Sequence, residues 1–96
     1  MDKEEKYEKL IQKFIGKKNL KIATIIREGK VGARLAAKIH QEVKNYHDEV
    51  YWHGCLYEME SLEKMPTPKR IQERFGISRF FAEKLLCRYM ELKYED

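Results

Sequence analysis

Apolar residues recur along most of the chain at three- and four-residue spacing, which is the period of helices that bury one face. The spacing predicts six helices, over about residues 3–16, 20–28, 32–46, 51–64, 68–75 and 78–93. The predicted fold class is therefore all-α.

Glycine, proline and hydroxyl residues mark where these helices begin and end. Gly29 and Gly76 each follow a short apolar-periodic segment, where a helix C-terminus favours a left-handed residue. Thr67 suits an N-cap with Pro68 in the first helical turn, and Ser78 suits the N-cap of the last helix. The second predicted helix is expected to bury Ile22, Ile25 and Ile26. The sixth is expected to bury Ala82, Leu85, Leu86, Tyr89 and Leu92.

The two halves of the chain repeat the same plan. A shift of 46 positions aligns residues 25–39 with residues 71–85. The aligned pairs are mostly of a buried type, namely Ile25/Ile71, Val31/Ile77, Leu35/Phe81, Ala36/Ala82, Ile39/Leu85, Leu10/Leu56 and Ile11/Tyr57. The pattern predicts tandem three-helix units over residues 1–46 and 47–96, sharing a core in one compact domain. A short β-wing at residues 50–59, with a strand on each side of Gly54, is an alternative for that segment.

Each copy ends in a short helix, a tight turn and a longer helix, which is the order of elements in a helix-turn-helix. A permissive residue such as Gly76, an apolar plug such as Ile77 and a small residue such as Ala82 would let the two helices cross closely. A helix held in this way fits the major groove of DNA. The side chains expected to read base edges are Arg34, Lys38, Ser78, Arg79, Phe80 and Glu83. Those expected to contact phosphates are Lys21, Lys30, Lys69, Arg70, Arg74, Lys84 and Arg88.

Charge is distributed unevenly, in a way that favours phosphate binding. The 96 residues carry a net charge of +4, but residues 9–44 carry +8 and residues 64–88 carry +5. The segment between them, residues 47–63, carries −5. Two basic blocks on a small protein suggest a polyanionic partner. The 38% of charged residues, rich in Lys and Glu, also indicates a heat-adapted source.

The segment "QERFGISRFFAEKLL" resembles the helix-turn-helix of bacterial and archaeal transcription regulators. The segment "VGARLAAKI" resembles the winged-helix gamma domain of the FtsK/SpoIIIE DNA translocases. Each resemblance covers roughly 20 residues and implies duplex DNA binding through Arg34 and Lys38, with Arg79 and Lys84 as their counterparts. In the gamma domain a basic residue stands next to the Ala pair, where this chain has Leu35.

The pattern leads us to expect a DNA-binding protein, either a small transcription regulator or a replication or partition accessory factor. The alternative is a helical protein-protein or RNA-binding adaptor. We expect no enzymatic activity, cofactor or small-molecule substrate, since the chain has no Gly-rich phosphate loop, no HExxH and no GxSxG. We expect no metal site, because His40, His47, His53 and Cys55 lack ligand spacing. A cytoplasmic location without a membrane span is expected, and a homodimer through exposed aromatic residues is an option.

Overall fold

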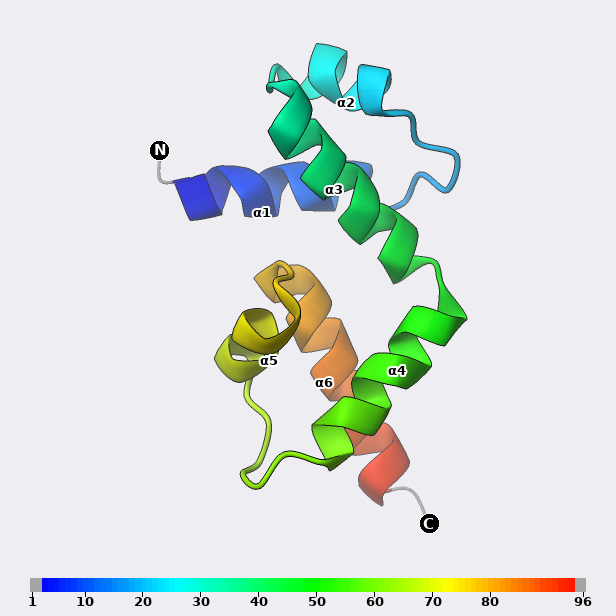
Figure 1. The fold of residues 1–96 in the computed structure, drawn as a ribbon, viewed down its shortest axis with the longest axis vertical. Coiled ribbons are helices and arrows are strands. Elements are labelled where there is room, and N and C mark those ends of the chain that lie inside the picture. The colour runs from blue at the N-terminus through cyan, green and yellow to red at the C-terminus, as the bar shows by residue number, and fades with distance from the viewer. Residues whose placement is uncertain (1–2, 95–96) are drawn as a thin grey trace. The chain divides into compact units, whose positions relative to one another are not determined.

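The structure is a computed structural model that describes residues 3–94, and every regular element among these residues is a helix (Figure 1). The helices are α1 (Lys3–Phe14), α2 (Ile22–Gly29), α3 (Ala33–Tyr46), α4 (Glu49–Glu60), α5 (Pro68–Phe75) and α6 (Arg79–Tyr94). The all-α prediction is confirmed. The alternative β-wing at residues 50–59 is not formed, because α4 runs through the whole of that segment.

The chain divides into two compact units between Asp48 and Glu49. In the first unit α3 packs against both α1 and α2, and α2 lies across the beginning of α3 (Figure 1). In the second unit α6 packs in the same way against α4 and α5. The longest helix of each unit is therefore the one that holds its other two helices together.

Each unit has a hydrophobic core of its own helices. Buried residues of the first are Leu10, Ile11, Phe14, Leu20, Ile25, Val31, Ala36, Ile39 and Val43. Those of the second are Trp52, Cys55, Met59, Ile71, Ile77, Phe81, Ala82, Leu85 and Tyr89. Burial raises the pKa of the Cys55 thiol to about 11, because an apolar environment disfavours the thiolate.

The sequence repeat corresponds to equivalent buried positions in the last two helices of each unit. The pairs Ile25/Ile71, Ala36/Ala82 and Ile39/Leu85 are all fully buried. The pairing of Ile11 with Tyr57 is wrong, since Ile11 is fully buried and 78% of Tyr57 is exposed. The buried faces of α1 and α4 align instead at a shift of 45, which pairs Leu10 with Cys55 and Phe14 with Met59.

Three residues that the periodicity places inward lie at the surface. Ile22 is 39% exposed, Ile26 is 38% exposed and Leu92 is 57% exposed. The helix α2 has only eight residues, and it reaches the core through Ile25 alone. Ile22 and Ile26 lie at the two edges of the buried face of α2.

The turn between α2 and α3 contains a left-handed residue one position later than predicted. Gly29 is the last residue of α2, and the left-handed residue is Lys30, with φ 53° and ψ 50°. The prediction for Gly76 is confirmed, with φ 64° and ψ 40° at the end of α5. Lys30 and Gly76 are 46 positions apart, so the repeat pairs them. Gly29 instead permits close packing, because a Cβ atom there would lie 3.2 Å from Leu10 Cδ2.

Replacement of Lys30 by glycine is expected to stabilise the protein by about 0.5–1 kcal/mol, because glycine adopts the left-handed conformation without the steric cost that a Cβ atom brings. Urea unfolding of Lys30→Gly measures the change. Gly76→Ala is the matched control and should be destabilising. An added Cβ atom there has no neighbour within 4 Å, so the loss of stability would come from the left-handed backbone conformation alone. A destabilising Lys30→Gly would contradict this account of the turn.

Predicted caps fix the starts of α5 and α6. The Thr67 hydroxyl accepts a hydrogen bond from the Arg70 backbone N–H at 3.2 Å, with Pro68 in the first turn. The Ser78 hydroxyl accepts one from the Phe81 backbone N–H, also at 3.2 Å. Each cap satisfies a helix N–H that has no partner within the helix.

Candidate nucleic-acid interface

Both units contain a short helix and a longer helix joined by a three-residue turn. The turns are residues 30–32 and 76–78, and each consists of a left-handed residue, a buried apolar residue and the residue before the next helix. Ala36 and Ala82 are fully buried one turn into the longer helix, where a small side chain permits close helix packing. This order of elements is the one predicted for a helix-turn-helix, in which the second helix would present its first two turns outward.

In the first unit, the exposed start of α3 combines small residues with two cations. Gly32, Ala33 and Ala37 are exposed, as are the predicted base-reading residues Arg34 and Lys38. Arg34 forms no ion pair with any residue from 3 to 94. Lys38 Nζ lies 4.6 Å from the centroid of the Tyr7 ring, which steadies the ammonium without neutralising it.

In the second unit, the start of α6 presents different chemistry. Arg79 Nε lies 2.7 Å from Glu83 Oε1, so these two predicted base-reading residues form an ion pair with each other. Phe80 is half-buried, and Lys84 Nζ lies 5.4 Å from the centroid of its ring. The charge on this surface is therefore partly neutralised within the helix itself.

Ser78 does not point outward, and its predicted role as a base-reading residue is wrong. Only 1% of Ser78 is exposed, and its hydroxyl is used by the cap on the Phe81 N–H. Because it is buried and already bonded to the Phe81 N–H, the Ser78 side chain is not available to a base edge.

Counting from the left-handed residue of each turn gives the true equivalences between the two units. Arg34 is equivalent to Phe80, and Arg79 is equivalent to Ala33. Arg34 and Arg79, which the resemblance treats as counterparts, thus lie one position apart in the common frame. Only Lys38 and Lys84 occupy the same position.

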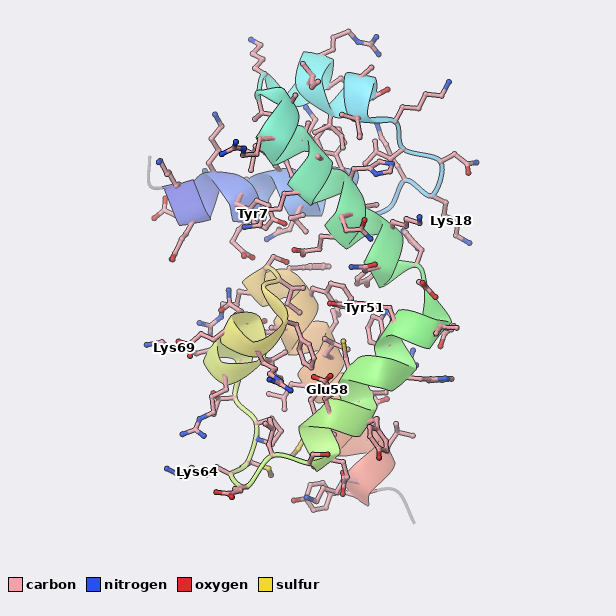
Figure 2. The ribbon with its side chains drawn as sticks, in the orientation of Figure 1. Tyr7, Lys18, Tyr51, Glu58, Lys64 and Lys69 are labelled. Carbon is pink, nitrogen blue, oxygen red and sulfur yellow. The ribbon has the colours of Figure 1, made fainter. Side chains whose placement is uncertain are left out.

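The predicted phosphate-binding residues fall into two groups. Exposed side chains near the turns or helix starts are those of Lys21, Lys30, Lys69, Arg70 and Lys84; Figure 2 shows Lys69 extending outward from α5. The other two are held by carboxylates of the second unit. Arg74 Nε lies 3.2 Å from Glu58 Oε2, and Arg88 lies 3.7 Å from Glu49 with its guanidinium 4.8 Å from the Trp52 ring.

A basic cluster around Glu28 was not singled out by the sequence. Lys17 Nζ lies 3.6 Å and Arg27 3.9 Å from the Glu28 carboxylate, and Lys13 donates to the Glu28 carbonyl oxygen at 3.2 Å. Three cations thus gather around one anion beside α2. The basic block over residues 9–44 was the only sequence signal for them, because they come from three different segments.

The net charge of the protein lies in its first half. Residues 1–48 contain twelve Lys and Arg against seven Asp and Glu, a net charge of +5. Residues 49–96 contain eight against nine, a net charge of −1. A long-range attraction to any polyanion would therefore act mainly on the first unit.

A buried carboxylate joins α3 to α1. Glu42 is 4% exposed, and its Oε1 accepts a hydrogen bond of 2.8 Å from the Tyr7 hydroxyl, on α1. Burial, together with the negative charge of Glu42, raises the pKa of Tyr7 well above its ordinary value. The pair fixes α1 against α3 about two turns after Arg34, on the side of the helix where Lys38 also contacts the Tyr7 ring.

His40 of α3 and His47, the residue after α3, bond to the connection between α1 and α2. His40 Nε2 lies 2.9 Å from the Leu20 carbonyl oxygen, and His47 Nε2 lies 2.6 Å from the Ile15 carbonyl oxygen. Because a carbonyl oxygen only accepts, Nε2 carries the proton in both rings. These imidazoles have a structural role, and residues 3–94 contain no group of three His, Cys, Asp or Glu side chains that could hold a metal ion.

The second unit also has an open cavity of about 600 Å³ beside α5. It is lined by Leu62, Glu63, Lys64, Arg70, Glu73 and Arg74. Its charged lining consists of three cations and two carboxylates. Among residues 3–94, no helix is long and apolar enough to cross a membrane.

Comparison of the chain with protein-family models, with curated proteins and with solved structures finds no match to any of them.

Proposed function

We propose that this protein binds double-stranded DNA through helix-turn-helix recognition, as a small transcription regulator or an accessory factor of replication or partition. The observation that carries the proposal is the repeated turn. In both units a left-handed residue, a buried apolar residue and a buried alanine set a short helix against a longer one whose first turns are exposed. That geometry suits insertion of the longer helix into a major groove.

The charge pattern also supports the proposal. Arg34 and Lys38 flank small exposed residues at the start of α3, where a guanidinium can form two hydrogen bonds to guanine. Lys21 and Lys30 stand at the two ends of α2, the helix that would cross the phosphate backbone. Such cations release counterions from DNA when they bind, and this makes affinity depend steeply on salt.

The proposal predicts strong salt dependence. Fluorescence anisotropy with a labelled duplex should give an affinity that falls at least about tenfold between about 50 mM and about 200 mM salt, as expected for several phosphate contacts. A single-stranded oligonucleotide of equal length is the control and should bind more weakly. An affinity for duplex that does not change with salt would refute the proposal, and tighter binding to the single strand would redirect it to another nucleic acid.

A further inference from the structure

We propose that the two units do not share the reading of DNA: α3 of the first unit enters the groove with Arg34 as its base-reading residue, and α6 of the second unit does not read bases. This inference deepens the proposed function and rests on it. It follows from what each unit places at equivalent positions after its turn.

The position of Arg34 is the first difference. Its equivalent in the second unit is the half-buried Phe80, which cannot donate hydrogen bonds to a base. The neighbouring positions in the first unit are the small Ala33 and Ala37, so the backbone of α3 can approach base edges closely and the methyl groups can contact thymine. Arg34 keeps its charge and its donors for a ligand.

The position of Ala37 is the second difference. Its equivalent is Glu83, and this carboxylate accepts the hydrogen bond from Arg79 Nε at 2.7 Å. A carboxylate at that position repels the phosphates on either side of the groove, and on the bases it could accept hydrogen bonds only from amino groups such as that of cytosine. Arg79 is thus paired with a carboxylate, whereas Arg34 forms no ion pair with any residue from 3 to 94.

The turn itself gives an independent third difference. Both turns require a left-handed residue, which glycine supplies without strain at position 76, whereas the first unit has Lys30 there. A strained non-glycine residue is expected where its side chain contributes to function. Lys30 places a cation in the turn between α2 and α3, in the half of the chain that carries the net charge of +5.

The test compares Arg34→Ala and Arg79→Ala in the full-length protein. The probes are a duplex selected from a random pool by the wild-type protein and a scrambled duplex of equal length. Arg34→Ala should weaken binding to the selected duplex about tenfold and leave binding to the scrambled duplex nearly unchanged, as expected for loss of a base contact. Arg79→Ala should change both affinities less than about twofold.

Two further variants sharpen the result. Arg34→Lys keeps the charge but loses the paired donors, so it should also lose the preference for the selected duplex. Lys44 is on the same helix, about 15 Å from Arg34 along the helix axis, so Lys44→Ala should keep that preference. Circular dichroism checks that each variant is folded.

The outcomes separate the two proposals. Salt-dependent duplex binding in which Arg79→Ala costs as much specificity as Arg34→Ala overturns the division between the units and leaves the DNA-binding function intact. Equal loss on both duplexes for Arg34→Ala makes it a phosphate contact and overturns its reading role. Absence of duplex binding by the wild type refutes both.

Discussion

Replacement of Phe81 by alanine is expected to destabilise the second unit by about 3–5 kcal/mol, which is the usual cost of truncating a buried aromatic residue. Phe81 is fully buried, and its ring centroid lies 5.3 Å from that of Trp52 and 5.7 Å from that of Tyr51. A small unit has only a few kcal/mol of stability in total, so this loss should come close to unfolding it. Urea unfolding followed by fluorescence measures it, since Trp52 is the single tryptophan.

The adjacent phenylalanine supplies the control. Phe80 is half-buried, and its ring has Lys84 Nζ at 5.4 Å. Phe80→Ala should therefore cost about 1 kcal/mol, because less apolar surface is lost and water can replace the ring. If the two variants were equally unstable, the buried face of α6 would be assigned to the wrong residues.

Replacement of Tyr7 by phenylalanine is expected to cost about 1–3 kcal/mol, since it removes a hydrogen-bond donor from a buried carboxylate. The Tyr7 hydroxyl donates to Glu42 at 2.8 Å, and Glu42 is 4% exposed. Urea unfolding at neutral pH measures the loss. Tyr57→Phe, at a tyrosine that is 78% exposed, should be nearly neutral.

The same pair should give the protein a pH dependence in the alkaline range. The folded protein holds the Tyr7 proton more tightly than the unfolded chain does, because burial and Glu42 raise the pKa of this phenol. The contribution of the Tyr7 proton to the free energy of unfolding is fully present below the pKa of about 10 in the unfolded chain. It is lost progressively as the pH rises above that value. Stability of the wild type should thus fall more steeply above about pH 10 than that of Tyr7→Phe. Parallel curves for the two proteins would contradict a raised pKa for Tyr7.

The helices could be predicted well because their signals are local. Apolar spacing and the residues at their ends, such as Thr67 with Pro68 and Gly76, act within one or two turns of the chain. The left-handed Lys30 was missed because lysine has no preference for that conformation, so the nearby Gly29 was the natural prediction. Its pairing with Gly76 at a shift of 46 positions was the available signal.

The candidate interface was predictable only as a set of positions. The sequence identified the exposed cations Arg34, Lys38 and Arg79, but not which of them a carboxylate would hold. The pair of Arg74 with Glu58 joins residues 16 apart on different helices, and no helical spacing predicts it. Ser78 was assigned two incompatible roles, cap and base contact, and burial decides for the cap.

The attachments of α3 bear on what association with DNA would cost. Glu42 of α3 accepts a hydrogen bond from α1. His40 of α3 and His47, directly after it, are hydrogen-bonded to the segment that connects α1 to α2. If α3 enters a groove, it would do so together with its unit as one preorganised body, so its backbone would lose little conformational entropy on binding. Few contacts would then suffice for the proposed binding, since little of their free energy would be offset by the ordering of the protein.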